Sequence, residues 1–285
     1  MNKQEAWMHR HARPVDLARW KYWQGTGSAS AVLEALGWYQ NGDGGFGHGL
    51  EPDYWNPNSS PIQAWRATLI LREIGCFDGA LPLVGRLIGY LEHAGDNGVW
   101  KALIPSNDDH PHAPWWQYNH ENDTWGYNPG AALSGFLVRC GCGVDSVIQK
   151  TIDTFLAQTD SDMHELPCFL QLYDDLRATG WKQEQLGAVR ARLAEVLEQN
   201  VVRDPTLWGG YCLRPSMIFN ESNREFQAPF RQAISEEQQY LMDTVGPDGA
   251  WDINWAWAEY PEAFAVAKEW WKGDQIIKYC RFLAL

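Results

Sequence analysis

A turn that recurs along the chain restricts the possible folds more than any other feature of the sequence. Each copy follows the end of a predicted helix, passes through small residues and reaches an aromatic side chain. Asp-Gly and Gly-Gly steps supply the positive φ angles that tight connections between helices need. Phe46 and Trp100 are 54 positions apart and Tyr211 and Trp251 are 40 apart, so each unit has room for two helices and two loops. The copies span residues 39–46, 90–100, 204–211 and 240–251.

Between these turns the apolar residues recur with the period of helices, and strand-like alternation is scarce. Ser60 and Pro61 are residue types typical of an N-cap and a first helical position, and Gly75 is placed to end that helix. A second helix opens at Asn128-Pro129 and runs to about residue 140. We therefore expect an all-α protein. Further helices are predicted over residues 16–24, 28–40, 80–93, 144–158, 163–179, 182–199, 227–244 and 261–283, the last with a break at Gly273.

Polar loops that carry tryptophan lead into several helices that begin with an X-Pro step. Trp55, Trp125 and Trp257 lie in three such loops, before the helices that start near residues 61, 129 and 261. If the helical hairpins close into a ring, these loops gather at one end of it. They would then form the rim of a central cavity.

The turn sequences also carry a family resemblance. Residues 40–46 and Gly249-Ala250-Trp251 resemble the Gln-Trp repeats of squalene-hopene cyclases and protein prenyltransferase β subunits. The stretch from Gly37 to Asp53 is similar to a group of bacterial prenyltransferase/squalene-oxidase-repeat proteins of unsettled activity. The resemblance implies an α/α toroid, with inner and outer helices around a hydrophobic cavity, and we expect five or six helical hairpins in a single domain over residues 1–285. Thr244 stands where the repeat has Gln, and the acidic and metal-binding motifs of those enzymes are absent from the sequence.

Composition excludes several classes of function. A formal net charge of −13 without a basic stripe argues against nucleic acid as a partner. Apolar runs fall far short of the roughly 18 residues of a membrane span, and no signal-peptide core follows Met1, so a cytoplasmic location is expected. Six cysteines are too few for a disulfide scaffold. The 17 tryptophans predict a cavity lined with aromatic faces that takes a small-molecule substrate.

The loop before residue 61 holds the first candidate site. His48, Glu51 and Asp53 could perform acid–base chemistry if burial moves their pKa values apart. The same loop could bind Ca²⁺ through Asp43 together with Glu51 and Asp53. The alternative is structural, with both carboxylates capping backbone N–H groups. If the site is catalytic, Glu51→Gln and Asp53→Asn should abolish turnover and leave the melting temperature nearly unchanged.

Two further loops hold candidate residues. Asp108 with His112 and the neighbouring histidines could ligate zinc or another divalent metal, or the loop could form a cavity rim through Trp115 and Trp116. His164 and Glu165 stand at the start of a predicted helix, where they could face the cavity or simply cap the helix. The proposed catalytic residues are His48, Glu51, Asp53, Asp108 and Glu165.

Aromatic side chains near residue 255 form the densest cluster of rings and acids in the chain. Their faces can stabilise a cation or stack on a sugar ring. The proposed substrate-binding residues, including those of the other loops, are Trp55, His112, Trp115, Trp116, Trp125, Tyr127, His164, Trp255 and Trp257.

The sequence leaves three functions open. The first is an enzyme similar to terpenoid cyclases and prenyltransferases, in which an acid starts or ends chemistry on an isoprenoid or similar substrate. The second is a hydrolase or lyase acting on carbohydrate, since tryptophans with carboxylates suit a sugar cleft. The third is a non-catalytic binding or scaffold protein. No cofactor is predicted, although a divalent metal remains open, and the oligomeric state is not predicted.

Overall fold

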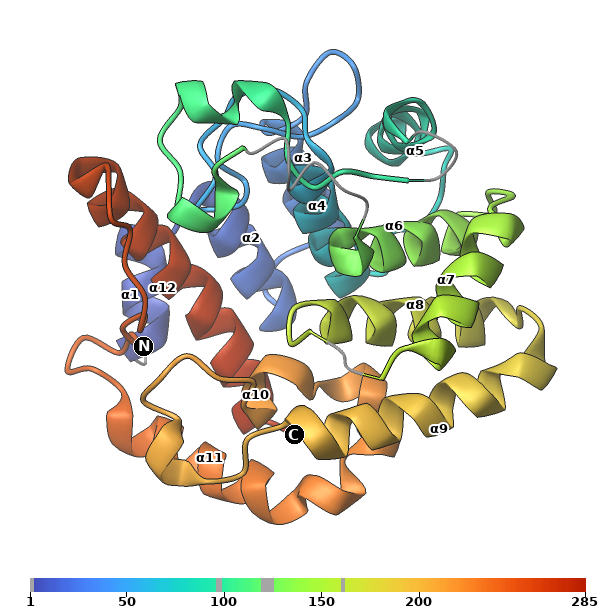
Figure 1. The fold of residues 1–285 in the computed structure, drawn as a ribbon. Helices are drawn as coiled ribbons and strands as arrows, with labels where there is room; N and C mark the ends of the chain where they lie inside the picture. The colour runs from blue at the N-terminus through green and yellow to red at the C-terminus, as the bar shows by residue number, and fades with distance from the viewer. Residues whose placement is uncertain (1–2, 96–98, 119–125, 160–161) are drawn as a thin grey trace. The chain divides into compact units, whose positions relative to one another are not determined.

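The protein is all-α. The computed structural model describes residues 3–95, 99–118, 126–159 and 162–285, and within them the regular structure is entirely helical apart from two isolated β-bridges (Figure 1). The α-helices are α1 (Lys3–His11), α2 (Pro14–Trp23), α3 (Ala29–Gly37), α4 (Pro61–Glu73), α5 (Pro82–Ala94), α6 (Tyr127–Arg139), α7 (Asp145–Ala157), α8 (Glu165–Thr179), α9 (Gln183–Asn200), α10 (Pro215–Ile218), α11 (Arg231–Thr244) and α12 (Pro261–Leu283). Short 3₁₀ helices lie at Pro105–Asp109, Pro114–Trp116, Pro205–Leu207, Glu221–Phe226 and Ala228–Phe230.

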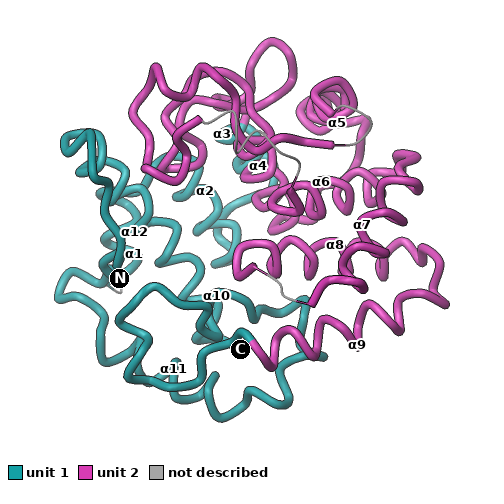
Figure 2. Tube along the Cα trace, in the orientation of Figure 1, with its two compact units in different colours: residues 1–36, 200–285 teal, residues 37–199 magenta. Residues whose placement is uncertain are grey.

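The chain divides into two compact units. Unit 1 comprises residues 1–36 and 200–285, and unit 2 comprises residues 37–199 (Figure 2). The closed ring and the single domain over residues 1–285 stay predictions.

In unit 2, deeply buried helices alternate along the chain with helices that bury one face. Ten of the thirteen residues of α6 and nine of the thirteen of α4 are buried. Only Val84, Leu87 and Leu91 are buried in the thirteen residues of α5. A helix buried on most sides lies inside its unit, whereas one with a single apolar stripe covers the outside. Helices α4 and α6 therefore lie inside unit 2, and α5 lies at its outside.

The buried helices α6 and α8 run parallel. The rings of Tyr127 and Phe169, near the start of each helix, have centroids 5.2 Å apart. One to two turns further on, a Cβ placed on Gly135 would lie 2.9 Å from the Cα of Leu172. The small side chain at Gly135 therefore allows the two backbones to approach closely.

Helix α4 has the same direction as its buried neighbour α8. The indole of Trp65, in the first half of α4, donates to Oε1 of Gln171 at 3.1 Å. Arg72, near the end of α4, pairs with Oδ2 of Asp175 at 2.5 Å. Partner positions increase together along both helices, so the N-termini of α4, α6 and α8 share one end of unit 2.

In unit 1 the two ends of the chain pack together through a buried ion network. Asp16 is fully buried and accepts from Arg13 at 2.7 Å and from Arg19 at 2.8 Å. Arg19 also pairs with Asp274 of α12 at 2.8 Å. Buried charges persist when each has an opposite partner and hydrogen bonds, and this network joins α2 to α12.

Two of the recurring turns, one in each unit, have the same hydrogen bonds. The N–H of Asn41 donates to Gly45 at 2.9 Å, and that of Gly246 donates to Ala250 at 2.8 Å. The aspartate of each turn accepts from the backbone two residues later, at 2.9 Å in the first turn and 3.2 Å in the second. Gly44 and Gly249 have φ angles of 91° and 97°. Their equivalent conformations explain the repeated Asp-Gly step.

One tryptophan in each of three repeat copies is anchored in the same way. Trp100, Trp208 and Trp251 are buried, and each indole N–H donates at 2.9 Å to a backbone carbonyl that precedes the turn. The acceptors for Trp100 and Trp251 are Leu91 and Leu241, in the preceding helices. A buried indole needs such a partner for its one donor, and in these three copies the backbone supplies it.

Helix ends agree with the sequence prediction where they depend on local signals. Ser60 accepts from the N–H of Gln63 at 3.4 Å as the N-cap of α4, and Gly75 has the left-handed φ of 66° beyond its end. The predicted break at Gly273 is wrong, because α12 continues through it to Leu283. Gly273 instead faces Trp7 and Asp16, so its missing side chain admits the N-terminal helices. Helices α1 and α10 were not predicted.

Among the described residues, no helix has both the length and the apolar character needed to cross a bilayer.

Replacing Gly249 by alanine should destabilise the protein by more than about 2 kcal/mol. The new Cβ would require a positive φ and would lie 2.7 Å from the carbonyl carbon of Lys3. Gly25→Ala is the matched control, since Gly25 has φ 71° and open space around its Cβ position. Urea unfolding should show a loss of about 1 kcal/mol for the control. Equal losses in both variants would contradict the close contact with α1.

Candidate functional site

The loop before α4 is held by a buried glutamine. Gln63 is 0% exposed, its Oε1 accepts from the N–H of Glu51 at 2.7 Å, and its Nε2 donates to the carbonyl of Tyr54 at 2.6 Å. Both ends of one amide are therefore used to hold a single turn of the loop. The sequence alone did not identify Gln63, because its partners lie 9 and 12 positions away on a different element.

Glu51 and Asp53 are buried, being 5% and 2% exposed. Oε2 of Glu51 lies 4.0 Å from Nε of Arg66, whose side chain is also buried. Removing one partner of a buried ion pair leaves an uncompensated charge. The pair gives Glu51 a buried contact with Arg66, which was not a predicted site residue, and the catalytic and backbone-capping roles both stay predictions.

His48 does not join these carboxylates. It is exposed, has a φ of 59°, and its Nε2 bonds to Oδ1 of Asn41 at 2.9 Å. The triplet of His48, Glu51 and Asp53 therefore does not form one hydrogen-bonded acid–base set.

A short antiparallel contact brings the second loop to the first. The N–H of Ala113 donates to Asp53 at 2.9 Å and that of Trp55 donates to Pro111 at 3.1 Å, which pairs Tyr54 with His112. Side chains of such a pair are adjacent on one face, and their chain neighbours point to the other face. Asp53 and Trp55 thus face away from His112. Burial raises the pKa of Tyr54 to about 12.

His112 is buried, and both of its ring nitrogens lie near oxygen atoms. Its Nδ1 donates to the carbonyl of His110 at 2.7 Å, and its Nε2 lies 4.0 Å from Oδ1 of Asp108. Asp108 itself is partly exposed and accepts from the N–H of Tyr118 at 2.7 Å. Asp108 therefore lies on the side of the imidazole that carries Nε2.

The aromatic residues of the second loop differ in exposure. Trp115 is 48% exposed, whereas Trp116 packs edge-on against Tyr54 with ring centroids 6.0 Å apart. Trp55 donates its indole N–H to Pro52 at 2.8 Å within its own loop. Trp125, the fourth predicted tryptophan of these loops, lies outside the described residues.

The start of α8 combines a histidine, two carboxylates and an aromatic ring. Nδ1 of His164 bonds to Oδ1 of Asp162 at 2.9 Å, and both side chains are about half exposed. The half-buried Glu165 accepts a hydrogen bond from the backbone of Tyr127, at the start of α6. Burial raises the pKa of Glu165 above its usual range, although this hydrogen bond opposes the shift. Asp162 was not among the predicted site residues.

These loops share one end of unit 2. Since α4 and α8 run parallel, the described segments that lead into these two helices enter at the same side, and the β-bridge between Tyr54 and His112 brings the second loop to the first. The loop with Glu51, the loop with His112 and the start of α8 with Glu165 therefore gather there. The gathering of the loops with Trp55, Trp125 and Trp257 stays a prediction, since Trp125 lies outside the described residues and Trp257 belongs to unit 1.

Unit 1 contains the remaining aromatic candidates, Trp255 and Trp257. Trp255 lies edge-on to Trp271 at 5.3 Å and to Tyr211 at 6.3 Å between ring centroids. Trp257 is buried and packs against Phe264 at 5.7 Å. Tyr211, which was not predicted, is 55% exposed and offers an accessible ring beside Trp255.

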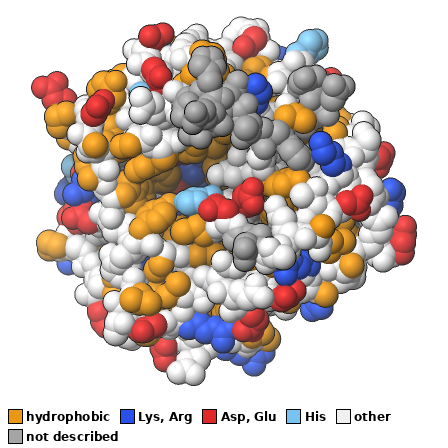
Figure 3. Space-filling model, in the orientation of Figure 1, with side chains coloured by type: hydrophobic (Ala, Val, Ile, Leu, Met, Phe, Trp, Pro, Cys, Tyr) orange, Lys and Arg blue, Asp and Glu red, His pale blue; other side chains and the backbone are white. Residues whose placement is uncertain are grey.

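Metal ligation has limited support. In the part of the chain that the structure describes, no group of three or more His, Cys, Asp or Glu is placed to hold an ion. Oδ1 of Asp43, a predicted Ca²⁺ ligand, accepts from the N–H of Gly45 and the hydroxyl of Ser59 instead. On the face drawn in Figure 3, acidic and basic side chains are interspersed.

The chain matches no protein-family model, no curated protein and no solved structure.

The burial of Glu51 changes the expected result of replacing it. Glu51→Gln should destabilise the protein by about 1–3 kcal/mol, because the charge of Arg66 loses its buried partner. The exposed Glu184 of α9 provides the control, since Glu184→Gln should change the free energy of unfolding by less than about 0.5 kcal/mol. Denaturant titration measures both. If Glu51→Gln leaves the free energy of unfolding unchanged, the ion pair with Arg66 contributes little, and the prediction of Glu51 as a purely catalytic residue is favoured.

Proposed function

We propose that the protein is an acid–base enzyme of the terpenoid cyclase and prenyltransferase kind, which protonates an isoprenoid or similar hydrophobic substrate. The observation that carries the proposal is Glu165, a half-buried carboxyl of raised pKa that accepts a hydrogen bond from the backbone of Tyr127. A raised pKa keeps more of a carboxyl protonated near neutral pH, as a general acid requires.

The neighbours of Glu165 suit the formation of a cation. Tyr127 packs on Phe169 at 5.2 Å, and Phe169 stacks on Phe155 at 4.2 Å between ring centroids. Electron-rich ring faces stabilise positive charge as it develops on a substrate. Glu165 would donate its proton to a carbon–carbon double bond or an epoxide oxygen. The resulting carbocation would then be held against these rings.

His164 would complete the reaction. Its Nδ1 is bonded to Asp162 at 2.9 Å, which orients the ring. A carboxylate on one ring nitrogen favours the tautomer in which the other nitrogen accepts a proton. Nε2 would take a proton from the carbon next to the cation, and a double bond would form there.

Three features support the proposed toroid. Buried and half-exposed helices alternate in unit 2. The buried helices run parallel, as the inner helices of stacked hairpins do. In unit 1, α12 pairs with α2 through Arg19 and Asp274, so the ends of the chain meet.

A carbohydrate hydrolase or lyase is the second candidate. It is favoured by the exposed rings of Trp115 and Tyr211, which could stack on sugars. The buried ion pair of Glu51 favours the non-catalytic alternative for that loop alone.

Product analysis can separate these functions. The purified protein would be incubated with farnesyl diphosphate, geranylgeranyl diphosphate and squalene, and separately with a panel of oligosaccharides. We expect an isomer of one isoprenoid substrate, since proton gain and proton loss leave its composition unchanged, and this product is lost in Glu165→Gln and retained in Glu184→Gln. Cleavage of an oligosaccharide would replace the proposal by the second candidate. Neither product, with no binding of any probe, would favour a scaffold protein.

A further inference from the structure

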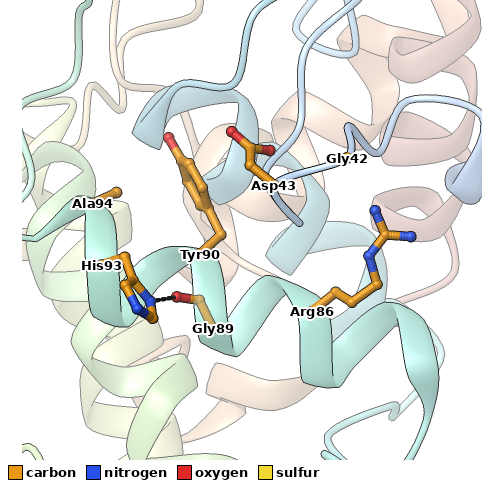
Figure 4. A pocket seen from close by; sticks show the side chains of 7 residues that line it. All are labelled: Gly42, Asp43, Arg86, Gly89, Tyr90, His93 and Ala94. Atoms are coloured by element: carbon orange, nitrogen blue, oxygen red, sulfur yellow. Dashed lines mark hydrogen bonds between the residues drawn. The ribbon is translucent and has the colours of Figure 1, made fainter.

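Outside the proposed site, a hollow lies between the first Gly-rich turn and α5. Its volume is about 630 Å³, which is within the usual range of small-molecule sites, roughly 300–1,000 Å³. Figure 4 shows the turn above the helix, with the side chains of Asp43, Arg86, Tyr90 and His93 around the space. All of these residues belong to unit 2.

Glycines create the hollow. The turn sits directly on α5, because a Cβ on Gly44 would lie 2.2 Å from the carbonyl oxygen of Arg86 and one on Gly45 would lie 2.7 Å from the ring of Tyr90. Beside this contact, Gly42 and Gly89 have no atom within 4 Å of their Cβ positions. Gly89 occupies the middle of a helix, where glycine costs stability relative to alanine. The open space above it is consistent with a use other than packing.

The polar side chains have hydrogen-bonding capacity left over. Arg86 donates one N–H to the carbonyl of Asn41, and no other described partner takes its remaining donors. His93 donates from Nδ1 to Gly89 at 2.6 Å, which leaves Nε2 without a described partner. Tyr90 interacts electrostatically with Asp43, and its hydroxyl has no hydrogen bond among the described residues. The hollow therefore offers donors and acceptors together with one aromatic ring.

This mixed lining indicates the chemical class of ligand. A simple anion would be repelled by Asp43, and a simple cation would be repelled by Arg86. Hydroxyl groups can both accept from Arg86 and donate to Asp43. A pyranose ring also presents C–H groups that pack on an aromatic face such as that of Tyr90.

We infer that the hollow between residues 42–45 and α5 is a binding site for a hydroxyl-rich small molecule, of monosaccharide or disaccharide size. The site is separate from Glu165 and does not depend on the proposed reaction. Arg86 and His93 bind ligand oxygens from one helix face, and Asp43 accepts from a ligand hydroxyl.

Titration calorimetry and ligand-observed NMR on the 285-residue protein test the inference. The probes are glucose, galactose, N-acetylglucosamine, glucuronate, maltose and cellobiose. Inorganic phosphate and free arginine serve as the simple anion and cation. We expect at least one saccharide to bind, with no binding of phosphate or arginine at the same concentration.

Two substitutions locate the binding. Gly89→Leu places a bulky side chain in the hollow, starting from a Cβ position with no atom within 4 Å, and should weaken saccharide binding by more than about tenfold. Gly187→Leu is the matched control, because Gly187 is an exposed glycine within α9 whose Cβ position is also open. Tyr90→Phe should weaken binding by about three- to tenfold through loss of the hydroxyl. Circular dichroism confirms that each variant is folded.

The outcomes are distinct. Binding that is lost in Gly89→Leu and kept in Gly187→Leu supports the site. The inference is overturned if no saccharide binds, if phosphate or arginine binds in its place, or if Gly89→Leu binds saccharide as well as the unaltered protein. Turnover of an isoprenoid should be the same in Gly89→Leu, so failure of this site and failure of the proposed function are separate results.

Discussion

Glu165→Gln should slow turnover by about 10²–10⁴-fold and at the same time make the folded protein more stable at neutral pH. Glutamine can accept the backbone hydrogen bond from Tyr127, but it cannot donate a proton to a substrate. The loss of rate and the gain in stability come from one cause, which is the burial of an ionisable carboxyl.

The sign of the stability change follows from the raised pKa of Glu165. A carboxyl whose pKa is higher in the folded state than in the unfolded state binds more protons when folded. Its favourable contribution is complete below its ordinary pKa, and it is lost as the pH rises through the folded value. At neutral pH the buried carboxylate therefore lowers stability, and glutamine removes this effect.

Thermal unfolding of both proteins between pH 4 and 8 measures the difference. The variant should melt about 1–3 °C higher at neutral pH, and the two melting temperatures should converge towards pH 4. Glu184→Gln, on the exposed face of α9, should show no such pH-dependent gain. A Glu165→Gln protein that is less stable at every pH would assign Glu165 to structure, as a cap between α8 and α6.

Arg72→Met should lower the free energy of unfolding by about 3–5 kcal/mol. Arg72 joins all three buried helices of unit 2, since it pairs with Asp175 of α8 at 2.5 Å and donates to the carbonyl of Ala132 of α6 at 2.9 Å. Its guanidinium also lies 5.5 Å from the ring centroid of Phe136. Methionine keeps the aliphatic stem but leaves Asp175 as an uncompensated buried charge.

The double variant Arg72→Met with Asp175→Asn separates charge from packing. Burial already raises the pKa of Asp175, and Arg72 opposes that shift. Without Arg72 the carboxyl should protonate more readily, so the stability deficit of Arg72→Met should shrink as the pH falls. The double variant should recover much of the loss at neutral pH because no buried charge remains. A single-variant loss below about 1 kcal/mol would show that the pair contributes little to joining these helices.

Local signals explain the success of the helix prediction. The hydroxyl of Ser60 meets an N–H three residues away, and Gly75 needs only its own backbone freedom. The two equivalent turns at Gly44 and Gly249 likewise depend on hydrogen bonds between residues that are at most four positions apart. The prediction failed at Gly273, because a glycine inside a helix ends it only if nothing else packs there, and here α1 and α2 do.

The candidate site could be predicted only in part. The sequence identified Glu51, His112 and Glu165 as residues of chemical interest, and their loops do share one end of unit 2. It did not identify Arg66 or Asp162, whose importance comes from the side chains they contact. His48 is adjacent in sequence to the carboxylates but bonds to Asn41, since its left-handed backbone turns it away.

The amino-acid order alone sufficed for the all-α class, most helices and the shape of the Gly-rich turns, since these depend on hydrogen bonds between residues close along the chain. The direction of the buried helices, the ion pairs and the burial that raises the pKa of Glu165 required the folded chain. Trp65 and Gln171 are 106 positions apart, and Arg72 and Asp175 are 103 apart. Such partners meet only through packing, which no short-range pattern of residues encodes.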